Sequence, residues 1–113
     1  MHEVSIIQNA LEMAEAQARS RGATRIHSLT LRIGALSGVV PDALEFAFEA
    51  VSTGTMAEGA SLRIERVPAA AFCKQCGREF QPDEYLSQCP LCLSFSGEIR
   101  RGRELNLASL EVS

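Results

Sequence analysis

The four cysteines of this chain form two Cys-x-x-Cys pairs, and these are its clearest chemical signal. Cys73 and Cys76 make the first pair, Cys89 and Cys92 make the second, and twelve residues separate the pairs. A tight turn places both thiolates of a pair on one side, and the connecting loop is long enough to bring the pairs together. Four thiolates in a closed tetrahedron suit structural zinc. The spacing therefore predicts a zinc ribbon, somewhat shorter than the usual connection of about 15–20 residues.

The residues around the pairs fit metal-binding knuckles. Gly77 follows the first pair and Pro90 lies inside the second, and both residue types favour tight turns. Leu93 occupies the place where a second knuckle glycine is expected. This departure concerns the geometry of the turn more than the identity of the ligands.

Other uses of four cysteines are less favoured. Disulfides need an oxidising compartment, and the start Met1-His2-Glu3 does not resemble a secretory signal, so we expect a cytoplasmic protein. The spacing alone leaves an iron site open, because four thiolates also suit iron. A closed four-thiolate zinc site has no open position for substrate, and no catalytic constellation stands out. We therefore expect no enzyme activity.

The first three residues form a second metal-capable group. Met1 supplies an α-amine, His2 an imidazole nitrogen, and Glu3 a carboxylate, while deprotonated backbone nitrogens can complete a planar set. Square-planar nitrogen and oxygen coordination is typical of Ni(II) or Cu(II). A histidine beside the start methionine is more often simply an exposed terminal residue. The helix that follows at once tethers this group to a folded element.

Hydrophobic periodicity predicts two helices. Residues 4–20 carry apolar side chains at helical spacing, and Gly22 follows as a stop signal. Pro41 suits the first position of a second helix, which Gly54 ends. We expect the aromatic side chains of this helix, Phe46 and Phe48, in the core.

Strands are predicted over 24–33, about 62–67, and a returning segment over 98–112. His27 falls on the apolar side of the first strand, which favours a core or edge residue over a ligand. These elements predict an α+β fold, in which two helices pack on a small, about three-stranded sheet with an inserted zinc ribbon. The expected domains are residues 1–69 plus 104–113 and residues 70–103.

Composition restricts the class of partner. The 113 residues are 46% hydrophobic and 22% charged, with no apolar run long enough to cross a membrane. A net charge of −3 and the absence of tryptophan argue against nucleic acid as a ligand. Arg100, Arg101 and Arg103 form a local basic cluster. A solvated cluster beside Glu98 and Glu104 is the favoured interpretation.

Three stretches carry a resemblance to a known family. Residues 1–6 (MHEVSI), 32–39 (RIGALSGV) and 41–48 (PDALEFAF), together with the doubled Cys-x-x-Cys, closely resemble the HypA/HybF family. Members of this family are nickel metallochaperones for the maturation of [NiFe]-hydrogenase. The resemblance covers essentially the whole chain, and the N-terminal MHE combined with the four cysteines is its specific part.

The resemblance implies two metal sites with different roles. His2, with Met1 and Glu3, is implied to bind Ni(II) as cargo, and the four cysteines are implied to hold structural zinc. It further implies delivery to the hydrogenase large subunit with a HypB-type GTPase. Some members also serve urease maturation proteins, and the sequence leaves open whether the chain is a monomer or a homodimer. The alternative is a zinc-ribbon adaptor for protein or nucleic acid, with the arginine cluster as its contact and no nickel function.

Overall fold

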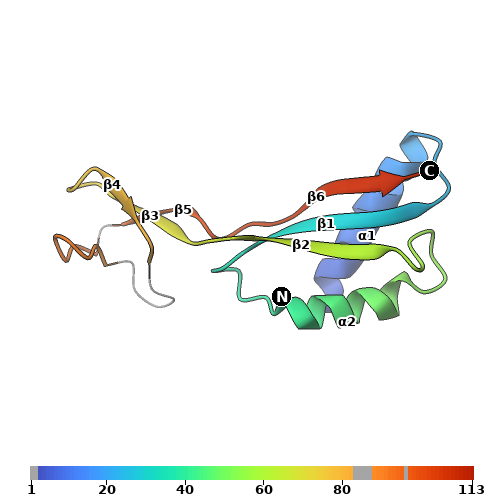
Figure 1. The fold of residues 1–113 in the computed structure, drawn as a ribbon, viewed down its shortest axis with the longest axis horizontal. Helices are drawn as coiled ribbons and strands as arrows, with labels where there is room; N and C mark the ends of the chain where they lie inside the picture. Colours follow the sequence, from blue (N-terminus) through green and yellow to red (C-terminus); the bar gives the residue numbers. More distant parts are fainter. Residues whose placement is uncertain (1–2, 83–87, 96) are drawn as a thin grey trace. The chain divides into compact units, whose positions relative to one another are not determined.

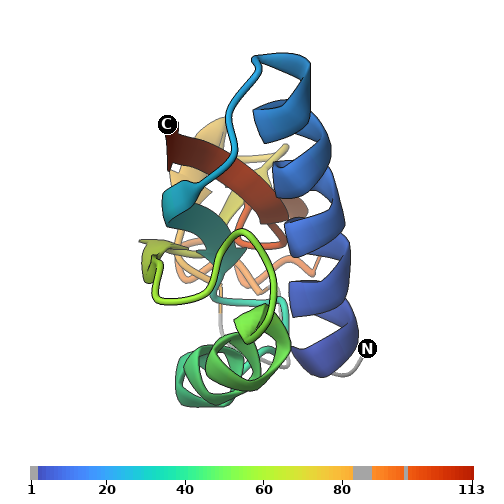
Figure 2. The same ribbon diagram turned by 90° about the vertical axis from the view of Figure 1, so that its right-hand side faces the viewer.

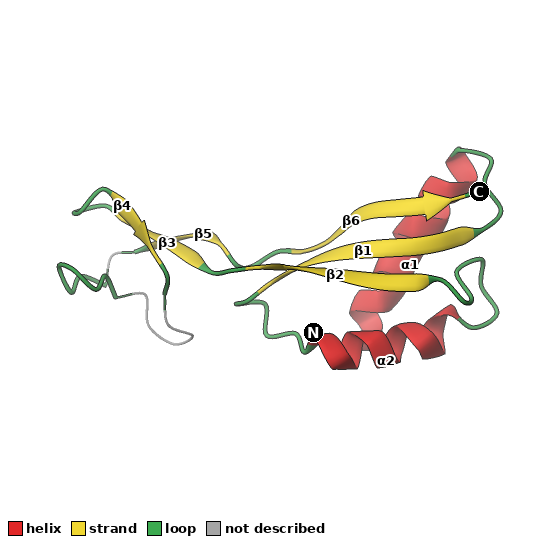
Figure 3. Cartoon of the chain, in the orientation of Figure 1, coloured by secondary structure: helices red, strands yellow, loops and turns green. Residues whose placement is uncertain are grey.

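The computed structural model describes residues 3–82, 88–95 and 97–113. Its elements are shown in Figures 1 and 3: α1 (Glu3–Ser20), β1 (Ile26–Gly34), α2 (Pro41–Ser52), β2 (Ser61–Val67), β3 (Ala70–Cys73), β4 (Arg78–Phe80), β5 (Glu98–Arg101) and β6 (Leu105–Val112). The strands form two three-stranded sheets, one in the order β2-β1-β6 and one in the order β4-β3-β5. The predicted α+β class with two helices and a small sheet is confirmed. Neither described helix is both long and apolar enough to cross a bilayer.

The chain divides into two compact units. The first comprises Met1–Arg32, Val39–Glu65 and Asn106–Ser113, and the second comprises Ile33–Gly38 and Arg66–Leu105. The segment after β1 therefore groups with the cysteine-bearing part of the chain. The domain boundaries expected from the sequence, at 69/70 and 103/104, stay a prediction.

Helix α1 forms because its apolar residues recur every three or four positions and so bury one stripe. The buried residues are Ile6, Ile7, Ala10, Leu11, Ala14 and Ala18. Gly22 ends the helix with φ of 71°, and the Ala23 amide donates to the Ala18 carbonyl over 2.9 Å. This is the usual left-handed glycine termination of a helix. Figure 2 shows α2 beside the first turns of α1.

The core of the first unit joins these helices to the central strand. Its largest fully buried side chains are Ile7 of α1, Ile26, Leu29 and Leu31 of β1, and Leu44 of α2. Burial of such a side chain contributes about 1.5–3 kcal/mol relative to exposure. Helix α2 begins with Pro41, where a missing amide donor costs nothing.

One sequence expectation about side-chain burial is wrong. Phe46 is 78% exposed, although Phe48 is 5% exposed as expected. The two residues are about 200° apart around the helix axis, so only one faces the core. His27 is exposed, and its Nε2 lies 2.7 Å from the Ser113 hydroxyl. The sequence favoured a core or edge residue over a ligand at this position, and His27 is an exposed residue near the start of β1.

The second unit is built on β3, which pairs antiparallel with both β4 and β5. Arg101 donates to Glu79 at 2.6 Å, and the Arg100 guanidinium lies 4.5 Å from the centre of the Phe72 ring. Arg100 also lies 3.6 Å from Glu98. The returning segment predicted over 98–112 is therefore two strands, β5 and β6, which separate at Gly102.

Two stretches of the second unit cross at Gly34 and Gly102. The Leu36 amide donates to the Gly102 carbonyl over 2.7 Å, and the Gly34 amide donates to the Glu104 carbonyl over 2.8 Å. A Cβ on Gly34 would overlap the Gly102 carbonyl oxygen, and a Cβ on Gly102 would lie 2.8 Å from the Ala69 Cα. The crossing thus requires glycine at both positions because any side chain would force the backbones apart.

We expect Gly34→Ala to lower the free energy of unfolding by about 2–3 kcal/mol, because the methyl group has no space. The control is Gly38→Ala, whose φ is +77° but whose added Cβ meets nothing within 4 Å. It should cost about 1–2 kcal/mol, the penalty of a left-handed backbone alone. Urea unfolding of the metal-loaded protein measures both. Equal effects would contradict the crowding argument.

Candidate metal centre

The four cysteines converge at one end of β3. Their sulfur atoms all lie within 4.8 Å of one another, with Cys73 Sγ 3.5 Å from Cys92 Sγ and Cys76 Sγ 3.8 Å from Cys89 Sγ. A tetrahedron with zinc–sulfur bonds of about 2.3 Å has sulfur–sulfur edges of about 3.8 Å. The close contacts join one cysteine of each pair, as a shared ion requires. The prediction that the two pairs meet is confirmed.

Each pair lies on the same kind of turn. In the first, the Gly77 amide donates to the Cys73 carbonyl over 2.8 Å, and in the second the Leu93 amide donates to the Cys89 carbonyl over 2.9 Å. Gly77 and Leu93 have φ of 67° and 61°. The two knuckles are therefore equivalent residue by residue.

Leu93 thus adopts the left-handed conformation that its glycine counterpart adopts freely. It is the one non-glycine residue with positive φ in the described part of the chain. For an ordinary side chain this conformation costs about 1–2 kcal/mol. The second knuckle keeps the geometry expected of a glycine although the sequence supplies a leucine, whose side chain is 63% exposed.

The thiol pKa values of the cysteines shift in different directions. Donation by the backbone amides of Cys92 and Leu91 lowers the pKa of Cys89 to about 6. A hydrogen bond with the Cys92 thiol is the main cause that raises the pKa of Cys76 to about 12. Four sulfurs this close cannot all carry negative charge beside one another. A dication among them would favour all four thiolates at once, because metal coordination deprotonates a thiol.

The predicted nickel group is only partly covered by the structure. Met1 and His2 lie outside the described residues. Glu3 is the first residue of α1 and is half-buried. An acidic residue there also stabilises the helix through the positive end of its dipole. The roles of Met1, His2 and Glu3 in nickel binding stay a prediction.

The chain matches a known family over almost its whole length. A family model described as "Hydrogenase/urease nickel incorporation, metallochaperone, hypA" matches residues 1–112. The hydrogenase maturation factor HypA of Picosynechococcus sp. is 54% identical over 112 residues, which is 99% of each chain. The chain belongs to the HypA family. The HypA of Geobacter metallireducens is 47% identical over the same share of each chain.

Solved HypA structures share the fold. The solution structure of the Ni metallochaperone HypA from Helicobacter pylori matches with a TM-score of 0.70 at 27% identity, over 99% of this chain and 97% of that one. A second HypA solution structure matches with a TM-score of 0.75 at 28% identity, over 100% and 97%. This chain is thus a member of a family of hydrogenase maturation factors and nickel metallochaperones, and the resemblance found in its sequence is confirmed.

The sequence predicted that the four cysteines converge, but it missed the sheet that presents them. Cys73 is the last residue of β3, and the alanines before it are a buried strand where the sequence suggested only a connection. Alanine has low strand propensity, so periodicity gave no signal. The spacing of the cysteines was enough because turn geometry alone fixes each pair.

Replacing Cys89 by serine should reduce zinc affinity more than 100-fold, because changes outside the ligand shell alone cost about 10–100-fold. Gln75→Ser, an exposed change within the first knuckle, should leave affinity within twofold. Competition with a chromophoric chelator measures both proteins. Full zinc retention by Cys89→Ser would exclude that cysteine as a ligand.

Proposed function

We propose that this protein binds Ni(II) at its N-terminus and delivers it for the maturation of [NiFe]-hydrogenase. The family match begins at residue 1, so it includes Met1, His2 and Glu3. That match is the observation that carries the proposal. The nitrogen and carboxylate donors of this group suit Ni(II) and differ in kind from the thiolates.

In this proposal the four cysteines hold structural zinc throughout the delivery cycle. The four sulfur atoms lie at least 3.5 Å apart and all within 4.8 Å of one another, which supports one metal ion bound by four thiolates. Two of the four cysteines are fully buried. Metal affinity at such a site is also folding free energy, because an unfolded chain has no preformed ligand set. Bound zinc would thus stabilise the second unit. It would offer no vacancy for a substrate, which agrees with a carrier that is not an enzyme.

The nickel group must release its metal, whereas the zinc site must retain it. A site with few ligands at a chain end exchanges its metal more easily than an enclosed cage, as a delivery protein requires. We place the protein in the cytoplasm, where thiolates stay reduced. Its partners would be a HypB-type GTPase and the hydrogenase large subunit, with urease maturation proteins as a further acceptor system. The two domains, residues 1–69 plus 104–113 and residues 70–103, would then separate cargo from structural metal.

The arginine cluster gives the adaptor alternative little support. Arg101 is engaged by Glu79, and Arg100 is engaged by Glu98 and the ring of Phe72. Side chains held in this way stabilise the β4-β3-β5 sheet. They leave Arg103 as the cluster member without an ion pair among the residues that the structure describes.

Calorimetric titration of the untagged protein with Ni(II) should show stoichiometric binding that His2→Ala abolishes, with zinc retained at one ion per chain. The matched control is His27→Ala, which removes the other histidine from an exposed position in β1. It should bind nickel normally. Loss of nickel binding in His27→Ala alone, or no binding by the native chain, would refute the terminal site.

Nickel affinity should fall as pH drops through about 6. Only the neutral imidazole ligates a metal, its reference pKa is ~6.5, and the amine and amides must also lose protons. The dissociation constant should rise about tenfold or more between roughly pH 7.2 and 5.5. Zinc content measured across the same range separates this effect from loss of structural metal. An unchanged dissociation constant would contradict imidazole ligation.

A further inference from the structure

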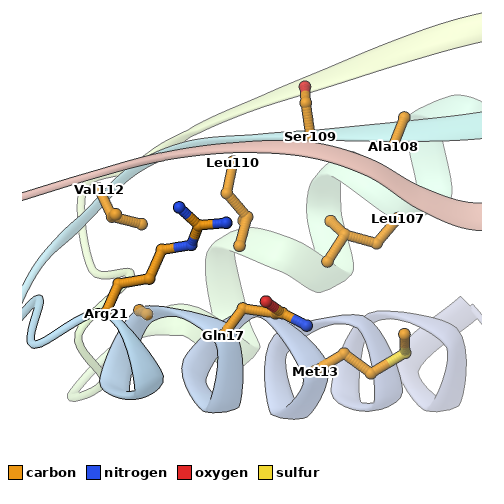
Figure 4. A pocket seen from close by; sticks show the side chains of 9 residues that line it. Met13, Gln17, Arg21, Leu107, Ala108, Ser109, Leu110 and Val112 are labelled. Carbon is orange, nitrogen blue, oxygen red and sulfur yellow. The ribbon is translucent and has the colours of Figure 1, made fainter.

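A groove of mixed apolar and polar lining runs between α1 and β6 in the first unit. Its volume is about 500 Å³, and Figure 4 shows the side chains that line it. One wall is β6 with Leu107, Leu110 and Val112, and the other is the flank of α1 with Met13 and Gln17. Met13 is 58% exposed, although it is a large apolar residue. The proposed nickel and zinc groups use none of these side chains.

The α1 wall is a regular row. Met13 and Gln17 lie four residues apart on the same side of α1, and Arg21, four residues further on, lies just after the helix ends at Ser20. All three are exposed, in contrast to the stripe that α1 buries in the core. In Figure 4 their side chains extend toward the same opening, beneath β6. Among the residues that the structure describes, no strand lies on this row.

The strand beside this row is an open edge. The sheet order is β2-β1-β6, so no strand of the described part of the chain pairs with the outer side of β6. Ser113 exchanges both backbone hydrogen bonds with Arg25, over 3.0 and 3.1 Å. Because antiparallel bonding alternates, the amides of Leu110 and Val112 then point away from β1, toward the open side.

The two edges of the sheet differ in protection. Strand β2 carries Arg63, Glu65 and Arg66, and charged side chains on an edge strand discourage further pairing. Strand β6 carries a single charge, Glu111, which pairs with Arg63 at 3.6 Å. The unguarded edge is therefore the one beside the groove.

Arg21 supplies a specific charge. Its guanidinium lies at the Val112 end of the groove, and within the described residues it has no ion pair. The neighbouring Arg19 instead pairs with Glu15 at 2.8 Å. A guanidinium without an ion pair among the described residues complements a carboxylate of a bound segment.

We infer that this groove docks an extended segment of a partner protein, which adds to β6 as a fourth strand. Its backbone bonds to the outward amides of β6, its apolar side chains enter the groove, and a carboxylate meets Arg21. Strand addition of this kind draws affinity from the backbone and specificity from the side-chain pockets. A second copy paired antiparallel through this edge would place both α1 helices on the same side of the joined sheet, and sedimentation velocity tests for that occupant.

The inference rests on the proposed function for its probe proteins, which are the nickel-free hydrogenase large subunit and the HypB-type GTPase. Arg21→Glu should raise the dissociation constant for one of them at least tenfold, while Arg19→Glu, with the same charge change, stays within twofold. Ser109→Lys should raise it at least fivefold, since the exposed Ser109 side chain points away from α1 and a lysine there guards the edge. Ser61→Lys on β2 is its control, with an effect below twofold.

Dissociation constants within twofold of wild type for every variant and both probes would overturn the inference. So would a wild-type protein that binds neither probe. If sedimentation velocity shows a wild-type dimer that Ser109→Lys dissociates and Ser61→Lys does not, the edge belongs to a second copy and the partner-segment inference fails. Nickel titration of each variant separates these outcomes from failure of the proposed function, because Arg21→Glu and Ser109→Lys should leave nickel binding unchanged.

Discussion

Repulsion among four sulfur atoms is the constraint on which the second unit depends. Cys73, Cys76, Cys89 and Cys92 are held at separations that suit thiolates around a dication and not thiolates alone. This arrangement also requires a left-handed backbone conformation at Leu93, which is unfavourable for a leucine. The short strands β4 and β5 add only a few residues each, so little apolar surface is available there to hold the knuckles without an ion.

The sequence predicted the parts of the molecule that obey local rules. Both helices were found because periodicity, Pro41 and Gly22 act over a few residues, and the cysteine pairs were found because their spacing fixes the turn. The prediction that Phe46 lies in the core was wrong because two residues two positions apart in a helix cannot share one face, and Phe48 occupies the buried face. The β4-β3-β5 sheet was missed because strands of three or four residues have too short a pattern to detect.

Helix α1 serves three parts of the first unit at once. One stripe forms the core with Leu29 and Leu31, and the first turn carries Glu3, one of the proposed nickel ligands. The exposed flank with Met13 and Gln17 forms one wall of the groove. A helix of 18 residues allows this because side chains on its different faces contact different parts of the molecule. Hydrophobic periodicity could indicate the buried stripe, but only the sheet order could show that the exposed flank lies beside an open edge.

The pairing of β6 with β1 has a consequence for how the chain folds. Gly34 ends β1 and Leu105 begins β6, so the first sheet closes only across a long intervening stretch. The pairing of β3 with β5 brings Ala70 near Arg101 and shortens that stretch by roughly half. Halving a loop lowers its closure entropy by only about 0.6 kcal/mol. Loss of metal should therefore slow the docking of the last strand by no more than a few-fold, and the chaperone can assemble its helical half before it has acquired any metal.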